Sequence, residues 1–316
     1  MRRSTLGAWP ELPYSAWRDT IATLHLWTQV VGKIRLSCTP WLNHSWHVPL
    51  YLTARGLTTS PIPYGNRSFS VDFDFIEHVL IIADSDGVRG QVTLQPRTVA
   101  DFYSAVMGAL NELSLPVRIN EMPNEIADAI GFTQDTAHRA YDRKAVQRFQ
   151  QALTQVGRVL SQFRTSFLGK CSPVHFFWGS FDLAVTRFSG RRAPLHAGVV
   201  PHLPRPVLRE AYSHEVSSAG FWPGGSGVEY AAFYSYAYPE PDGFRAAPVK
   251  PEGAFYNAAL GEFLLPYDAV RVAADPDAQL LAFLQSTYEA AADKGHWDRA
   301  TLECEPGRPG TPRRVD

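Results

Sequence analysis

The sequence is poor in cysteine, close to neutral in charge and free of long apolar runs. Three cysteines among 316 residues do not suggest a disulfide framework and favour a reducing compartment, so we expect a cytoplasmic protein. A net charge of −1 supplies no overall field for nucleic acid or anionic lipid. No apolar stretch approaches the roughly 20 residues that span a bilayer, and the N-terminus lacks the apolar segment of a secretory signal. Nucleic acid and membranes are therefore not expected partners.

Motifs that would name a reaction are missing as well. The chain has no Walker or dinucleotide-binding glycine pattern and no GxSxG nucleophile elbow. In "SHEVS", Ser218 stands where the second histidine of a metalloprotease HExxH motif would be. What the chain does contain is an ordinary globular composition, with 45% hydrophobic and 19% charged residues.

Apolar periodicity divides the chain into two halves. In residues 8–118, helical spacing over 15–37 and 98–113 encloses alternating segments at 46–53 and 68–75 and an Asp-Gly hairpin over 78–94. Apolar spacing then predicts a helix from Val146 to Phe167, ending before "GKCSP". Strands are predicted over 175–188, 227–241 and 261–272, and a closing helix over 277–292. This second half takes up residues 141–300.

A Pro- and Asn-rich connector, residues 119–140, joins the two halves, and residues 301–316 have the composition of a disordered tail. We therefore predict an α+β protein with two similar halves, each helix, antiparallel sheet, helix, packed as one unit. Without gaps, Cys38 aligns with Cys171 and Pro40 with Pro173. This alignment favours an internal duplication; two unrelated α+β halves are the alternative.

The halves differ most in one connection. The first half links its first two strands through residues 54–67, whereas the second uses residues 189–227. A connection that long is usually functional in a compact domain. It carries His214 and Glu215 and ends in the aromatic, glycine-rich "FWPGG".

Polar residues on one strand face and in this insertion are the candidate site. His214 and Glu215 are the predicted base and orienting carboxylate, with Asp182 and His47 as partners. His47, His175 and His214 are acceptable ligands for a divalent transition metal. Hydrogen-bonded structural histidines are the alternative, because no spacing among them is diagnostic.

Arginines and aromatic residues suggest how a ligand would be held. Arg187 and Arg191 could clamp a phosphate or carboxylate, or they could form a solvated basic rim. Trp178 and Trp222 are candidate walls of a cleft between the halves. A further predicted feature is a tyrosine face on one strand, which consists of Tyr230, Tyr234, Tyr236 and Tyr238.

Five stretches resemble the recurring blocks of an uncharacterised bacterial family, known only as a domain of unknown function: "TLHLWTQVVGKIRL", "LTARGLTTSPIPYG", "SPVHFFWGSFDLAVTRFSGR", "EAYSHEVSSAGFWPGG" and "FLLPYDAVR". The resemblance covers residues 8–300, supports a single unit and carries no activity or site residue. The leading hypothesis is a small-molecule enzyme that acts on an anionic substrate in the cleft, with or without the help of a metal, and with Tyr234 among the substrate-binding residues. The alternative is a non-catalytic ligand-binding or assembly module that uses the tyrosine face and the FWPGG loop. The sequence leaves the oligomeric state open.

Overall fold

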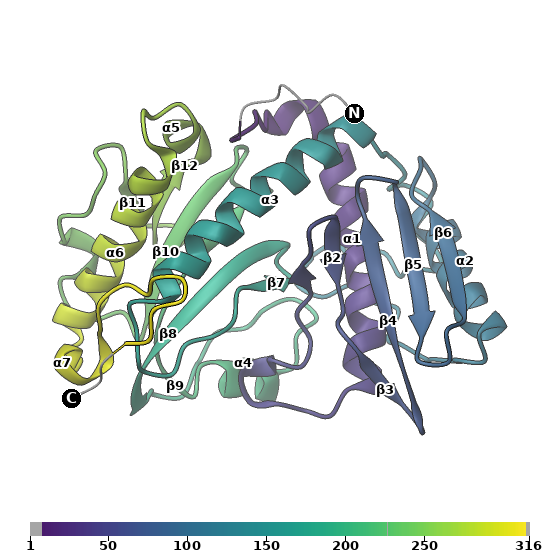
Figure 1. Ribbon diagram of the computed structural model, residues 1–316, viewed down its shortest axis with the longest axis horizontal. Coiled ribbons are helices and arrows are strands. Elements are labelled where there is room, and N and C mark those ends of the chain that lie inside the picture. The colour runs from purple at the N-terminus through teal and green to yellow at the C-terminus, as the bar shows by residue number, and fades with distance from the viewer. Residues whose placement is uncertain (1–7, 226, 314–316) are drawn as a thin grey trace.

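The computed structural model describes residues 8–225 and 227–313 (Figure 1). It confirms the predicted α+β class. Seven α-helices accompany two antiparallel sheets of six strands each in this part of the chain. The first helix, α1 (Tyr14–Cys38), matches the helix predicted over 15–37 and is buried around most of its circumference. It runs between the two halves in Figure 1.

The first sheet follows the chain almost strand by strand. Its strands are β1 (Tyr51–Leu52), β2 (Gly56–Thr58), β3 (Ile62–Tyr64), β4 (Arg67–Asp74), β5 (Val79–Asp84) and β6 (Arg89–Thr93). The order is β1-β2-β4-β5-β6, and β3 pairs with the first residues of β4, from Arg67 to Phe69. Alternation in β4 buries Phe69, Val71 and Phe73, as the sequence predicts.

The strand predicted over 46–53 is much shorter than expected. Only Tyr51–Leu52 is paired as a strand, and η1 (Asn43–Ser45) forms a 3-10 turn before it. His44 and Ser45 both have left-handed backbones, with φ of 57° and 56°. Two such residues in succession turn the chain away from an extended path.

Side-chain caps and apolar spacing define the three other long helices. They are α2 (Val99–Glu112), α3 (Arg143–Arg164) and α6 (Pro276–Lys294). Thr98, Asp142 and Asp275 cap them by accepting hydrogen bonds from backbone N–H groups of the first turn. All three agree with helices predicted from the sequence.

The second sheet has the order β11-β12-β10-β9-β8-β7. Its strands are β7 (His175–Phe177), β8 (Asp182–Arg192), β9 (His214–Trp222), β10 (Ala232–Tyr238), β11 (Phe255–Asn257) and β12 (Glu262–Pro266). The shorter helices of this half are α4 (Arg205–Ala211), η2 (Phe244–Ala246), α5 (Tyr267–Arg271) and α7 (Arg299–Leu302). The single strand predicted over 175–188 is split, because the chain turns between β7 and β8 and Phe181 has a φ of 58°.

The two halves share one core. Helices α3 and α6 cover one face of the second sheet. Leu50 beside β1 and Phe176 of β7 exchange two backbone hydrogen bonds of 2.9 Å, so the edges of the two sheets meet. Phe149 of α3 packs on Trp17 of α1 at 5.3 Å and stacks on Phe181 at 5.6 Å. Both halves contain six strands and a long helix on either side of them, but α4 and α5 interrupt this order in the second half, and the internal duplication stays a hypothesis.

The C-terminal segment is attached to the body as far as the structure describes it. Leu168 donates a 2.7 Å backbone hydrogen bond to Leu302, and Gly307 donates one of 3.0 Å to the Thr165 hydroxyl. Residues 301–313 therefore differ from the disordered tail predicted from composition; residues 314–316 lie outside the described part. No helix in the described residues is long and apolar enough to cross a membrane.

Candidate functional site

A cavity of about 470 Å³ lies against the face of the second sheet that α3 and α6 leave uncovered. Its floor is formed by strands β8, β9, β10 and β12. Its cover is formed by the turn around η1 and by residues 200–211, which include α4. The long connection predicted over 189–227 thus supplies the end of β8, the cover and β9; Ser226 is outside the described residues.

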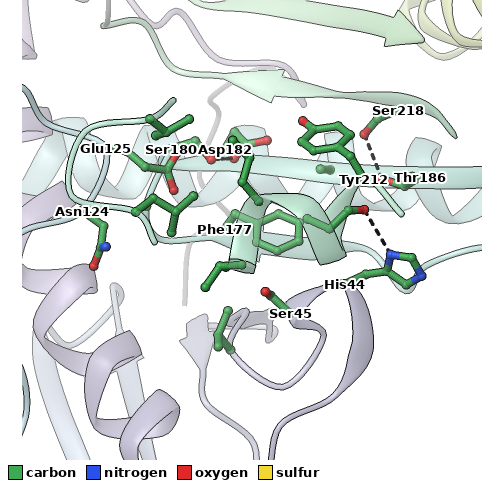
Figure 2. Close-up of a pocket in the computed structure, with 18 of the residues that line it drawn as sticks. His44, Ser45, Asn124, Glu125, Phe177, Ser180, Asp182, Thr186, Tyr212 and Ser218 are labelled. Atoms are coloured by element: carbon green, nitrogen blue, oxygen red, sulfur yellow. Dashed lines mark hydrogen bonds between the residues drawn. The ribbon is translucent and has the colours of Figure 1, made fainter. Parts of the chain in front are cut away.

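Strand register explains which residues form the floor. In an antiparallel sheet, residues directly opposite each other project to the same face. Thr186 of β8 pairs with Ser218 of β9, which pairs with Tyr236 of β10. All three line the cavity. The Thr186 and Ser218 hydroxyls are 2.8 Å apart and satisfy each other (Figure 2).

Asp182 is the central carboxyl of the cavity. It stands at the start of β8, is 4% exposed, and accepts hydrogen bonds from the hydroxyls of Ser180 and Tyr234. The Tyr234 ring reaches it across β9 at Gly220, where an added Cβ would lie 2.5 Å from the Tyr234 hydroxyl. A side chain at Gly220 would therefore block this contact. Burial raises the pKa of Asp182 to about 6, although its two hydrogen bonds favour the ionised form.

Glu125 comes from the connector and reaches the same end of the cavity. Figure 2 shows it beside Ser180 and Asp182. The residue is exposed, because its side chain faces the hollow, and its carboxyl lies among the other residues that line this end. Burial, and then the charge of Asp182, raise the pKa of Glu125 to about 7. It packs so closely on Gly179 that a Cβ there would lie 2.0 Å from its Oε1.

Helix α1 fixes the connector that carries Glu125. The Gln29 amide donates to the Asn124 carbonyl at 2.9 Å, and its Oε1 accepts from the Asn124 N–H at 2.8 Å. One turn further on, the Lys33 ammonium donates to the Met122 carbonyl at 2.8 Å. The backbone N–H of Glu125 donates to the Pro201 carbonyl at 2.8 Å. The connector is thus attached both to α1 and to the cavity cover.

Glu262, at the start of β12, is the third carboxyl. It lines the cavity, and no described residue gives its buried Oε2 a hydrogen-bond partner. Burial, and then the charge of Asp182, raise the pKa of Glu262 to about 8. Since each carboxylate disfavours ionisation of its neighbours, the three form a coupled group that holds protons near neutral pH.

The other end of the cavity is less acidic. His44 is 5% exposed, and its Nδ1 is 3.1 Å from the Ala211 carbonyl of α4 (Figure 2). Burial lowers the pKa of His44, so the neutral ring donates from Nδ1. The Lys170 ammonium lies close to this end, over the rings of Trp46 and Phe188 at 5.1 and 4.8 Å.

Backbone strain concentrates around the cavity. Among the non-glycine residues with positive φ, three line the cavity and two directly precede a lining residue. They are His44, Ser45, Glu125, Phe181 and His202. Such conformations are costly for residues with a Cβ and cluster at binding and catalytic sites.

Residues 9–304 match the model of a family described as a family of unknown function, DUF5996. The chain belongs to that family. No curated protein and no solved structure matches it significantly. Because the DUF5996 match spans both halves and the connector, membership supports treating the chain as one unit but assigns no chemistry to the cavity.

Four of the predicted site residues of this DUF5996 member line the cavity: Asp182, Trp178, Trp222 and Tyr234. His214 and Glu215 do not line it and are not a pair. As neighbours in β9 they project to opposite faces. The His214 ring lies 5.8 Å from His44 on the cavity side. Glu215 lies on the helix side, where it binds Arg191 at 2.7 Å and accepts from Ser189 at 2.8 Å.

The predicted arginine clamp is not in the cavity. Arg187 alternates with Thr186 and therefore projects to the helix side, where its guanidinium lies 3.5 Å from the Phe163 ring centroid and 4.3 Å from that of Tyr288. Arg191 binds Glu215 and donates to the His296 carbonyl at 3.1 Å, just beyond the end of α6. Both arginines hold helices against the sheet.

The predicted metal set does not assemble. No group of three His, Cys, Asp or Glu side chains in residues 8–225 and 227–313 is placed to hold a metal ion. The His47 ring packs on Trp41 at 4.5 Å, and its Nδ1 accepts from the Leu42 N–H at 3.2 Å. His175 is buried between Trp46 and Tyr51, and its pKa falls to about 3, chiefly through burial.

Glu125 and Glu262 are the cavity carboxyls that sequence reasoning missed. Glu125 lies in a connector without periodicity, so no pattern indicates where it points. Glu262 carries a weak signal, because it is one acidic residue at the start of an otherwise apolar strand. The tyrosine face was predicted, and register confirms that Tyr234, Tyr236 and Tyr238 share a side; Tyr230 precedes the strand.

Proposed function

We propose that this protein is an enzyme that acts on a small organic molecule in the cavity, with Asp182 as the residue that moves a proton. The observation that carries the proposal is the position of Asp182. It is a buried carboxyl at the start of a strand, oriented by two hydroxyl groups and lining a hollow of about 470 Å³. A volume of this size is typical of small-molecule sites.

Acid–base chemistry suits this carboxyl. A general acid or base works best when its pKa lies near the working pH. Burial brings the pKa of Asp182 to about 6, and the hydroxyls of Ser180 and Tyr234 hold its oxygens in fixed directions. Glu125 and Glu262 would then store or relay the proton that Asp182 exchanges with the ligand.

The cavity also suits a non-catalytic binding module, because its cover is mostly apolar. Residues that line it from this side include Val200, Leu203, Val207 and Leu208. The assembly role predicted for the tyrosine face has less support, because Tyr234 is 4% exposed and Trp222 lies in the cavity wall.

Incubation of a metabolite extract with the wild-type protein and with its variants tests the enzyme proposal. We expect the protein to convert at least one extract component, as detected by mass spectrometry. Asp182→Asn should slow that conversion by about 10²- to 10⁴-fold, and Ala184→Phe, which places a ring in the cavity floor, should abolish it. Glu215→Gln, on the opposite face of the sheet, is the matched control and should retain full turnover.

Two results would reject the enzyme proposal. One is conversion by Asp182→Asn at the wild-type rate, with a far-UV spectrum and melting curve that show it folded. The other is no conversion by the wild-type protein while a ligand still binds and Ala184→Phe abolishes that binding. The second result would establish the binding module.

A further inference from the structure

The cavity has an unbalanced charge. Three carboxyls line it, with Glu125 and Asp182 together at one end, and among the described residues no lysine or arginine lines any part of it. The nearby Lys170 ammonium lies over the rings of Trp46 and Phe188, toward the His44 end. An anionic ligand at the Asp182 end would have no basic partner and would lie beside Glu125, in a cavity that Glu262 also lines. A ligand that donates hydrogen bonds or carries positive charge is complementary to it.

The three carboxyls of the cavity do not fit a metal ion. Metal ligands must converge to within about 2.0–2.6 Å of one point. Glu125, Asp182 and Glu262 share the cavity, yet they do not form a group that could hold a metal among the described residues. Carboxyls that line one cavity without converging on a single point suit a larger cation, whose charge is spread over an organic group.

Aromatic rings complete the surroundings of the carboxyls. Trp222 and Tyr234 have ring centroids 4.9 Å apart, and Tyr234 stacks on Tyr236 at 6.2 Å. These rings line the floor beside Asp182. Ring faces attract ammonium groups, and sites for organic cations combine such rings with carboxylates. The rings therefore provide a second feature, independent of the carboxyls, that favours a cation.

The cover fits the rest of such a ligand. Val207, Leu208 and Ala211 of α4, with Val200 and Leu203 before it, present carbon to the hollow. An apolar ligand body can be buried there without leaving polar groups unpaired. The cavity thus has a charged end with aromatic walls and an apolar roof.

We propose that the ligand is a small organic amine, bound as an ammonium cation with its charged group beside Asp182 and its apolar body under α4. This inference rests on the proposed function of the cavity and specifies its ligand class. Neutral polar molecules and organic acids are the classes that it excludes as preferred ligands.

Three probes that share one ring system test the ligand class by calorimetry. They are tryptamine, a cation; tryptophol, its neutral alcohol; and indole-3-propionate, an anion. At about pH 8 we expect tryptamine to bind roughly tenfold or more tightly than tryptophol, and indole-3-propionate to bind least. Glu262→Gln should weaken tryptamine binding and leave tryptophol binding unchanged. Glu215→Gln should change neither.

Proton release gives a second readout. Asp182, Glu125 and Glu262 face the proposed cation, together with Tyr212, Tyr234, Tyr236 and His44. Of these, the carboxyls hold protons near neutral pH, so a bound cation should displace them. We expect tryptamine to bind more tightly at about pH 8 than at about pH 5.5 and to release protons, seen as a buffer-dependent binding enthalpy. Tryptophol should show neither effect.

The outcomes separate this inference from the proposed function. Equal affinity for tryptamine and tryptophol, or preference for indole-3-propionate, overturns the amine class. Loss of that binding in Ala184→Phe would still support a ligand cavity. If none of the three probes binds, the amine class is also overturned, and the turnover experiment alone then decides the proposed function.

Discussion

The two sheets have the same number of strands, but their outer faces meet different surroundings. On the first sheet, Ser70, Asp72 and Ile81 on the face opposite the core remain half-buried or partly open to solvent. On the second sheet, the corresponding outer face is covered by residues 200–211 and the η1 turn, and the cavity lies between. The outer face of the second sheet is therefore a candidate site because one long connection supplies most of its cover.

The comparison extends to individual acids. In the first sheet, Asp84 is 3.3 Å from Arg67 and accepts from the backbone N–H groups of Asp86 and Val88 at 3.0 and 2.9 Å. In the second sheet, no described residue provides a partner for Glu262 Oε2. The first arrangement is typical of a structural carboxylate. The second keeps a carboxyl oxygen buried without a hydrogen-bond partner, which is typical of a functional residue.

The largest expected effect comes from the shared core. Phe149→Ala removes a fully buried ring that packs on Trp17 of the first half and on Phe176 and Phe181 of the second. We expect it to lower the free energy of unfolding by about 3–5 kcal/mol. Urea unfolding followed by tryptophan fluorescence and far-UV circular dichroism should show one transition at a lower midpoint. Two separate transitions in the wild-type protein would show that the halves are independent domains.

Two helix glycines test how tightly the cavity wall is packed. One packs against Trp178 of the wall, and the other, on an open helix face, is the matched control. An added Cβ at Gly32 of α1 would lie 2.2 Å from the Trp178 ring, whereas at Gly108 of α2 it would meet nothing within 4 Å. Gly32→Ala should therefore destabilise the protein by about 1–3 kcal/mol. Gly108→Ala should stabilise it by up to about 1 kcal/mol through helix propensity. Thermal melts measure both, and stabilisation by both substitutions would contradict this packing.

The contrast between the acids predicts opposite responses at high pH. The pKa of Glu262 is about 8 in the folded protein against 4.5 when unperturbed. Between these pH values the unfolded chain loses a proton that the folded protein keeps, so this group makes stability fall as pH rises. Glu262→Gln should thus stabilise the protein by roughly 1–3 kcal/mol at about pH 8 and have little effect at about pH 4.5.

Asp84→Asn in the first sheet is the control for that experiment. It removes the charge of an acid that already has partners, so it should destabilise the protein at about pH 8. Urea titrations at the two pH values measure both variants. A loss of stability in Glu262→Gln at about pH 8 would mean that Glu262 is ionised and satisfied in the folded protein.

The smallest effect is expected on the helix side of the second sheet. Glu215 binds Arg191, whose side chain is 49% exposed. Ion pairs of this kind contribute about 0–1 kcal/mol, so Glu215→Gln should change stability by no more than that, and less in high salt. A large loss of ligand binding in this variant would place Glu215 in the site after all.

Sequence patterns predicted most of the fold but only part of the site. Helices such as α1 and α3, and the hairpin of β5 and β6, follow from local apolar spacing and turn residues. Asp182 was predicted because strand alternation places it on a polar face. The structure does not bring His214 and Glu215 together for a related reason, since the two residues of the long connection alternate in strand β9.

The remaining errors come from contacts between distant segments. Glu125 reaches Asp182 only because Gln29 and Lys33 of α1 bind the connector. Glu262 reaches the same cavity only because β12 pairs with β10. Neither contact leaves a period or spacing in the local sequence, and the single acid at the start of an apolar strand, which is the weak signal at Glu262, does not indicate the cavity that it lines.

Because the connector carries one of the cavity carboxyls, ligand binding in the cavity can report whether two fragments of the chain reassemble. Ala127 and Asp128 are exposed and lie two and three residues after Glu125. A chain divided between them would leave Glu125 on one fragment and Asp182 and Glu262 on the other. Neither fragment would carry the full set of carboxyls. Recovery of ligand binding on mixing would then measure reassembly of the two fragments, with α1 as the element that returns Glu125 to its place.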